Sequence, residues 1–135
     1  MAKPPIETTL VWQDELKFRA TSGHSAFTLD SKGVAGPSPM QGLIASLAGC
    51  MAIDVVMILQ KGRHPLTALE TKLVGHRADE EPRRYTTITL HFVVTGDVPA
   101  QAIERAIELS HDKYCSVWHS MRQDIELKST YEVRS

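Results

Sequence analysis

Two cysteines are the residues of this 135-residue chain whose type and setting suit covalent chemistry. Cys50 lies in the apolar stretch GLIASLAGCMAIDVVMIL, about three turns into a helix that we expect over residues 40–60. Burial raises the pKa of a thiol and makes it inert, so a reactive Cys50 needs a cation from elsewhere in the fold. The alternative is a small core residue among Ala and Gly, a setting where free cysteine is common.

Cys115 has a more polar setting, in the segment HDKYCSVWHSM. We expect this segment to be a loop that leads into a short helix, where backbone N–H groups favour a thiolate. An incidental loop cysteine is the alternative. The two cysteines are 65 positions apart, and this spacing alone does not show whether they touch.

Metal binding is the second chemistry that these residues suggest. His111, Cys115 and His119 are spaced by four residues each, which on a continuous helix would place them on one face. Cys50 would complete a four-ligand set. However, polar residues on both sides of His111 indicate that the helix ends there, and no CxxC or HExxH pattern is present. We therefore expect no metal site.

The apolar stretch over residues 42–59 carries Asp54 as its one charge. Its 18 residues reach the lower length limit of a transmembrane helix, but Asp54 and the water-soluble pattern elsewhere argue against a membrane. A helix that is apolar all round is buried all round, and a second subunit is the expected cover. Asp54 shares a helix face with Cys50, and we expect it to make a polar contact at a subunit interface or at the exposed side.

Composition places the chain among ordinary globular proteins and excludes several classes of function. A formal charge of −1 gives no broad electrostatic footprint for nucleic acid or for an acidic membrane surface. Two cysteines are too few to stabilise a small secreted scaffold through disulfide bonds. The start, MAKPPIETT, lacks the apolar run of a secretory signal, so we expect a cytoplasmic protein with reduced thiols. The length suits a single domain over residues 1–135.

The remaining pattern alternates strands with helices. The first thirty residues predict a meander of short strands, with Arg19 on the polar face of one of them. A Gly- and Pro-rich loop follows, and Ser38 caps the long helix with Pro39 at its first position. Two strands joined by a charged turn at 78–84, a helix after Pro99 and a strand over 124–133 complete the chain. Because short turns join consecutive strands, we expect antiparallel sheets and the class α+β.

Together, GPSPMQGLIASLAGCMAIDVV and HDKYCSVWHSM resemble the OsmC/Ohr superfamily of thiol-dependent hydroperoxide reductases. That family has a Pro-containing loop, an apolar helix with a Cys in its middle, and a second Cys in a short polar segment. The residues that match are Pro39, Gly49 and Cys50, then Lys113, Tyr114, Cys115 and Ser116. FRATS, at 18–22, looks like the family strand that carries a catalytic arginine, here Arg19. The order of strands and helices extends the resemblance to nearly the whole chain.

The resemblance implies an OsmC-like fold with a long buried central helix, in an intertwined homodimer. Cys50 would attack a small organic hydroperoxide and become a sulfenic acid, and Arg19 would stabilise its thiolate. Cys115 would resolve the sulfenic acid as a disulfide, which an external dithiol would reduce. No cofactor is implied. If another cation serves Cys50, Arg77 and Arg84 are the next candidates.

The sequence departs from the family at one position. The peroxidases usually carry Glu directly after the Pro that opens the helix, and here Met40 follows, then Gln41. That Glu orients the arginine over the thiolate, which Met cannot do and an uncharged Gln does only weakly. Met40 therefore keeps a second hypothesis open: an OsmC-fold protein that binds a small apolar ligand or senses redox state.

Overall fold

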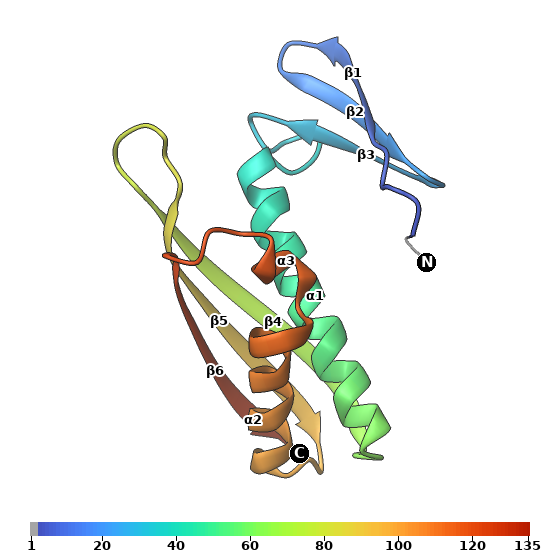
Figure 1. Cartoon of the computed structure of the whole chain (residues 1–135), viewed down its shortest axis with the longest axis vertical. Helices are drawn as coiled ribbons and strands as arrows, with labels where there is room; N and C mark the ends of the chain where they lie inside the picture. Colours follow the sequence, from blue (N-terminus) through green and yellow to red (C-terminus); the bar gives the residue numbers. More distant parts are fainter. Residues whose placement is uncertain (1–2) are drawn as a thin grey trace. The chain divides into compact units, whose positions relative to one another are not determined.

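The computed structural model describes residues 3–135, which divide into two compact units, one ending at Leu43 and the other Ile44–Ser135. Figure 1 shows the elements in chain order. They are β1 (Thr9–Asp14), β2 (Lys17–Ser22), β3 (Ser25–Asp30), α1 (Pro39–Lys61), β4 (Leu66–Arg77), β5 (Tyr85–Gly96), α2 (Ala100–Leu109), the π-helical turn η1 (Ser110–Tyr114), α3 (Ser116–His119) and β6 (Glu126–Arg134). Two three-stranded sheets and these helices confirm the α+β class.

The N-terminal unit contains the expected meander, because β1, β2 and β3 pair antiparallel in sequence order. Gly23 allows the tight turn between β2 and β3, since its φ of +57° lies in the left-handed region. Arg19 lies opposite Val11 and Thr28, with its side chain exposed as expected. Its guanidinium donates a long hydrogen bond of 3.5 Å to Thr28 Oγ1.

The loop between β3 and α1 is organised by one carboxylate. Asp30 is only 2 % exposed, and its oxygens accept backbone N–H groups from Lys32, Val34 and Ala35 at 3.0–3.3 Å. These hydrogen bonds favour the ionised form and lower the pKa of Asp30. The side chain therefore replaces the regular backbone pairing that a Gly- and Pro-rich segment lacks.

Helix α1 begins with a capping box. Ser38 Oγ accepts the N–H of Gln41 at 3.2 Å, and Gln41 Oε1 accepts the N–H of Ser38 at 2.9 Å. Ser38 is thus the N-cap and Pro39 the first helical residue, as predicted. At its C-terminal end the helix extends one residue beyond the expected Gln60.

The second sheet differs from the expectation of purely antiparallel pairing. β4 and β5 pair antiparallel, but β6 pairs with β5 in parallel. The connection between β5 and β6 is not a short turn. It passes through α2, η1 and α3, which carry the chain back along the sheet before it enters β6 (Figure 1). The expectation of antiparallel pairing is therefore wrong for this last strand.

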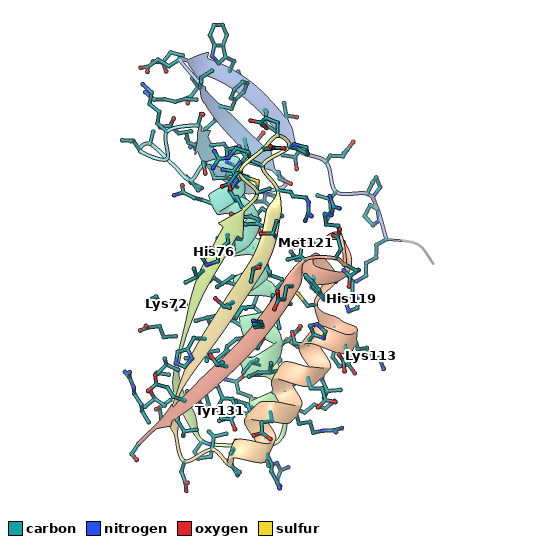
Figure 2. All side chains as sticks on the ribbon, turned by 90° about the vertical axis from the view of Figure 1, so that its left-hand side faces the viewer. Lys72, His76, Lys113, His119, Met121 and Tyr131 are labelled. Carbon is teal, nitrogen blue, oxygen red and sulfur yellow. The ribbon has the colours of Figure 1, made fainter. Side chains whose placement is uncertain are left out.

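The core of the C-terminal unit lies between this sheet and the helices that cover one of its faces (Figure 1). Lys72 and His76 of β4 extend from the opposite, exposed face (Figure 2). The alternation of β5 supplies the inner face, as predicted. The buried apolar side chains are Ile88, Leu90, Phe92 and Val94 of β5, Leu47, Met51, Val55 and Leu59 of α1, and Ile103, Ala106 and Ile107 of α2.

Helix α1 is not buried all round within this chain. Its buried residues recur every fourth position and form one stripe, whereas Ile53 and Met57 are 61 % and 62 % exposed. By length and composition, α1 is the one helix in the described part of the chain long and apolar enough to span a membrane. Within residues 44–135, this stripe is the side of the helix that is packed.

Candidate functional site

The fold brings the two cysteine side chains into contact despite their separation in sequence. Cys50 lies in the middle of α1 and is half-buried, and Cys115 lies between η1 and α3 and is fully buried. The Cys115 side chain lies near enough to the Cys50 side chain for Cys50 to raise its pKa, and both cysteines are free. This proximity is what a two-cysteine mechanism requires, and the roles of the two cysteines stay predictions. Cys50 is the more exposed of the two residues, although its helix setting predicted burial.

Cys115 is held in place by the turn before it and the helix after it. Its N–H donates to the carbonyl of Ser110 at 2.8 Å, which closes the π-helical turn η1 at the end of α2. Its Sγ accepts the N–H of Trp118 at 3.3 Å and so caps α3. The predicted position at the start of a short helix is confirmed. The predicted polar loop is wrong, because the helical path continues and the thiol is 0 % exposed.

The surroundings of Cys115 favour its neutral form. Burial is the largest influence and raises the pKa of the thiol, and the Trp118 N–H opposes it. The hydrogen bond with Cys50 and the negative charge of Asp54 both raise the pKa further. Together they move it from an ordinary 9.0 to about 11. The N–H group at the start of α3 is therefore outweighed, contrary to the expected thiolate.

Asp54 makes a contact that the sequence did not indicate. Its Oδ2 accepts the hydroxyl proton of Ser110 at 2.7 Å, from a serine that is 0 % exposed. The polar contact expected for Asp54 is thus found within the chain, and its role at a subunit interface stays a prediction. A signal for Ser110 was present, because it follows Ile103 and Ile107 at helical spacing and so continues the buried stripe of α2.

The histidines near Cys115 have other neighbours. The His111 ring stacks on Trp118 with centroids 5.7 Å apart, and its Nδ1 lies 2.7 Å from Asp112 Oδ1. His119 Nε2 lies 2.9 Å from the carbonyl oxygen of His111. Residues 3–135 contain no group of three or more His, Cys, Asp or Glu side chains placed to hold a metal ion. The spacing of four residues does not produce a ligand set because η1 interrupts the regular helix.

The arginines named as partners for Cys50 lie in different settings. Arg19 belongs to β2 of the N-terminal unit, where it reaches Thr28. Arg77 Nε donates to the carbonyl of Arg83 at 2.7 Å, and Arg84 donates to the carbonyl of Tyr85 at 3.2 Å. Arg77 and Arg84 therefore stabilise the turn between β4 and β5. The assignment of Arg19 to the thiolate stays a prediction.

Sequence comparisons find close similarity to one family. The family model described as OsmC-like protein matches residues 30–130. Protein YhfA of Escherichia coli strain K12 is 40 % identical over 131 residues, covering 95 % of this chain and 98 % of that protein. Both matches include the two cysteine segments.

Solved structures share the fold. A hypothetical protein from Aquifex aeolicus VF5 has a TM-score of 0.90 at 30 % identity, covering 98 % of each chain. An OsmC-like protein from Mycoplasma pneumoniae has a TM-score of 0.80 at 18 % identity, covering 98 % of this chain and 97 % of that one. An organic hydroperoxide resistance protein from Elizabethkingia anophelis has a TM-score of 0.72 at 17 % identity, covering 98 % and 99 %. The expected fold is confirmed.

Proposed function

This chain belongs to the OsmC-like protein family, and on that premise we propose that it reduces organic hydroperoxides with Cys50 and Cys115. The family is associated with peroxide and stress responses, and one structural relative is named for organic hydroperoxide resistance. The observation that carries the proposal is the contact between a half-buried thiol and a fully buried one. The partial exposure of Cys50 supports its role as the thiol that meets the peroxide, and the nearby Cys115 supports a second step with the oxidised Cys50.

The first step oxidises Cys50. Its thiolate attacks one oxygen of the hydroperoxide, the O–O bond breaks, and the products are a Cys50 sulfenic acid and an alcohol after protonation of the leaving alkoxide. The apolar residues next to Cys50 in α1 favour a hydroperoxide with an organic substituent over hydrogen peroxide. Arg19 is the proposed cation for this step, since a guanidinium stays charged at all relevant pH values.

The second step uses Cys115. Its sulfur attacks the sulfenic sulfur of Cys50, a disulfide forms, and the hydroxyl leaves as water with the thiol proton. An external dithiol then reduces the disulfide and becomes a disulfide itself, which restores both thiols. The two steps need no bound cofactor.

Peroxide consumption by the purified protein tests this function. With dithiothreitol as reductant and cumene hydroperoxide as substrate, we expect turnover by the wild type and none by Cys50→Ser. Cys115→Ser should complete the first step and stop, with one added oxygen detected by mass on Cys50. Cys50→Ser protein that consumes peroxide at the wild-type rate would refute the thiol mechanism.

A ligand-binding or redox-sensing role is the second candidate, and the start of α1 favours it. Met40 stands where the peroxidases carry Glu, and the amide of Gln41 is already engaged with Ser38 in the capping box. Neither side chain supplies a carboxylate for Arg19. Under this alternative, the wild type binds apolar molecules or forms the disulfide without multiple turnovers, and Met40→Glu raises its peroxidase rate.

The assembly and location belong to the same proposal. The open side of α1, marked by Ile53 and Met57, is an apolar surface of the kind that a soluble monomer does not expose. We therefore propose a homodimer with α1 near its centre, located in the cytoplasm where thiols are kept reduced.

A further inference from the structure

A side-chain contact outside the two thiols links the segments that carry them. Asp54 Oδ2 on α1 and Ser110 Oγ at the start of η1 are 2.7 Å apart, a short distance typical of a hydroxyl that donates to a carboxylate. Ser110 is fully buried and Asp54 is half-buried. The two residues are 56 positions apart in the chain, so the bond is a tertiary contact.

Each end of this contact is connected to one cysteine. Asp54 follows Cys50 by four residues and lies one turn further along the same helix. Ser110 accepts the N–H of Cys115 at its own carbonyl, at 2.8 Å. The N–H of Ser110 points back to the carbonyls of Ala106 and Ile107 in α2. One buried serine therefore joins the end of α2, the backbone of Cys115 and the helix of Cys50.

We propose that Asp54 and Ser110 are positioning residues that hold Cys115 against Cys50 and so make disulfide formation between them efficient. This inference rests on the proposed thiol chemistry, although it concerns the pair itself and not the peroxide. The contact restrains η1, whose π-helical turn sets the direction in which Cys115 leaves α2. Without it, the Cys115 segment keeps its own backbone hydrogen bonds but loses its side-chain link to α1.

The carboxylate has a second effect, through its charge. Burial is the largest influence that raises the pKa of Cys115, and the Trp118 N–H of α3 lowers it; Cys50 and, to a smaller extent, Asp54 on α1 raise it further. The charged side chains of η1 and α3 lie elsewhere: Lys113 and His119 are exposed on the outer side (Figure 2), and His111 stacks on Trp118. Asp54 therefore helps to keep the proton on Cys115 in the reduced state.

A thiol–disulfide equilibrium tests the positioning role without any peroxide. The full-length protein is incubated in buffers of reduced and oxidised glutathione, and the fraction with the Cys50–Cys115 disulfide is measured by alkylation and mass. Two glutathione thiols form as one glutathione disulfide is consumed. We expect Ser110→Ala to lower the equilibrium constant roughly tenfold, since it removes a hydrogen bond to a charged group. Ser120→Ala is the matched control, because its hydroxyl donates to the Ser116 carbonyl at the exposed end of α3.

The Asp54→Asn variant distinguishes the effect of the hydrogen bond to Ser110 from the effect of the negative charge. The amide oxygen still accepts the Ser110 hydroxyl, so the disulfide equilibrium should stay within about threefold of the wild type. In a Cys50→Ser background, the same change should shift the alkylation of Cys115 to lower pH because the negative charge is gone. Asp112→Asn, an exposed acid on η1, is the control for this shift.

The outcomes are distinct. An unchanged equilibrium in folded Ser110→Ala protein would overturn the positioning role, and so would Asp54→Ala protein with a wild-type equilibrium. Should Ser110→Ala not fold, Ser110→Thr keeps the hydroxyl and Asp54→Ala removes the acceptor, and their comparison decides the question. A wild type without peroxide turnover refutes the proposed function alone and leaves this equilibrium test standing.

Discussion

At the level of single residues, the two thiols differ in their surroundings. Cys50 is half-buried on α1, whereas Cys115 lies between η1 and α3 and is fully buried. Burial, a neighbouring thiol and a carboxylate all disfavour a charge on Cys115. This difference fits the proposed roles, in which Cys50 meets the substrate and Cys115 keeps its proton until Cys50 is oxidised.

The raised pKa of Cys115 makes stability fall at alkaline pH. Its pKa is about 11 in the folded protein and 9.0 as an ordinary value, so between these limits the unfolded chain loses the proton first. The stabilisation is complete below pH 9 and is lost as the pH rises through 11. Chemical unfolding from pH 8 to 11 should show a steeper loss for the wild type than for Cys115→Ser. Parallel curves for the two proteins would contradict this prediction.

At the level of elements, α1 is held at its start by side chains and along its length by packing. The capping box of Ser38 and Gln41 satisfies backbone groups that a helix start leaves open. The stripe of Leu47, Met51, Val55 and Leu59 then fixes the rotation of the helix over the sheet. That rotation decides which way Cys50 faces, so the cap and the stripe together position the proposed nucleophile.

Removing the cap should cost stability but not the fold. Ser38→Ala is expected to lower the free energy of unfolding by about 1 kcal/mol, because an N-cap hydrogen bond is lost. Gln41→Ala should lower the free energy of unfolding by less. The loss in the double variant should be smaller than the sum of the two single losses, since the two hydrogen bonds belong to one motif. Urea unfolding measures these differences. Gln101→Ala, at an exposed position in the first turn of α2, is the control and should change little.

The elements that local patterns determine were predictable from the sequence. The alternation of β5, the meander of β1–β3 and the cap at Ser38 all follow from neighbours within a few residues. The parallel pairing of β6 does not follow from local patterns, because the choice of partner strand depends on the path of the whole connection. The same applies to the site. Both cysteines could be named in advance, but Ser110 has its partner 56 residues away, and the enclosure of Cys115 is a property of the assembled unit.

At the level of the whole molecule, the main feature is the exposed apolar side of α1. Exposed apolar residues such as Ile53 and Met57 lie opposite the buried stripe of a helix with high mean hydropathy, 2.2 over its 18-residue window. Leaving such a face in water is unfavourable by roughly 25 cal/mol for each square ångström of apolar surface. A second copy that covers this face would remove the cost.

Sedimentation at micromolar concentration checks this assembly. The wild type should be a dimer, and Ile53→Asp should weaken association roughly tenfold or more by placing a charge in the apolar interface. Gln60→Asp puts the same charge at an exposed position near the end of the same helix and should leave the dimer intact. A wild-type protein that stays folded and monomeric would refute the dimer.

A disulfide between Cys50 and Cys115, as proposed, would also constrain the unfolded chain. A bond between Cys50 and Cys115 closes a loop that contains all of β4, β5 and α2. Closing a loop of this size removes unfolded conformations and, by chain entropy, stabilises the folded state by about 4 kcal/mol. The oxidised protein then unfolds less often than the reduced one, and proteases that cleave unfolded segments distinguish the two forms. Under the proposed chemistry, the redox state of Cys50 and Cys115 would therefore change the resistance of the protein to proteolysis.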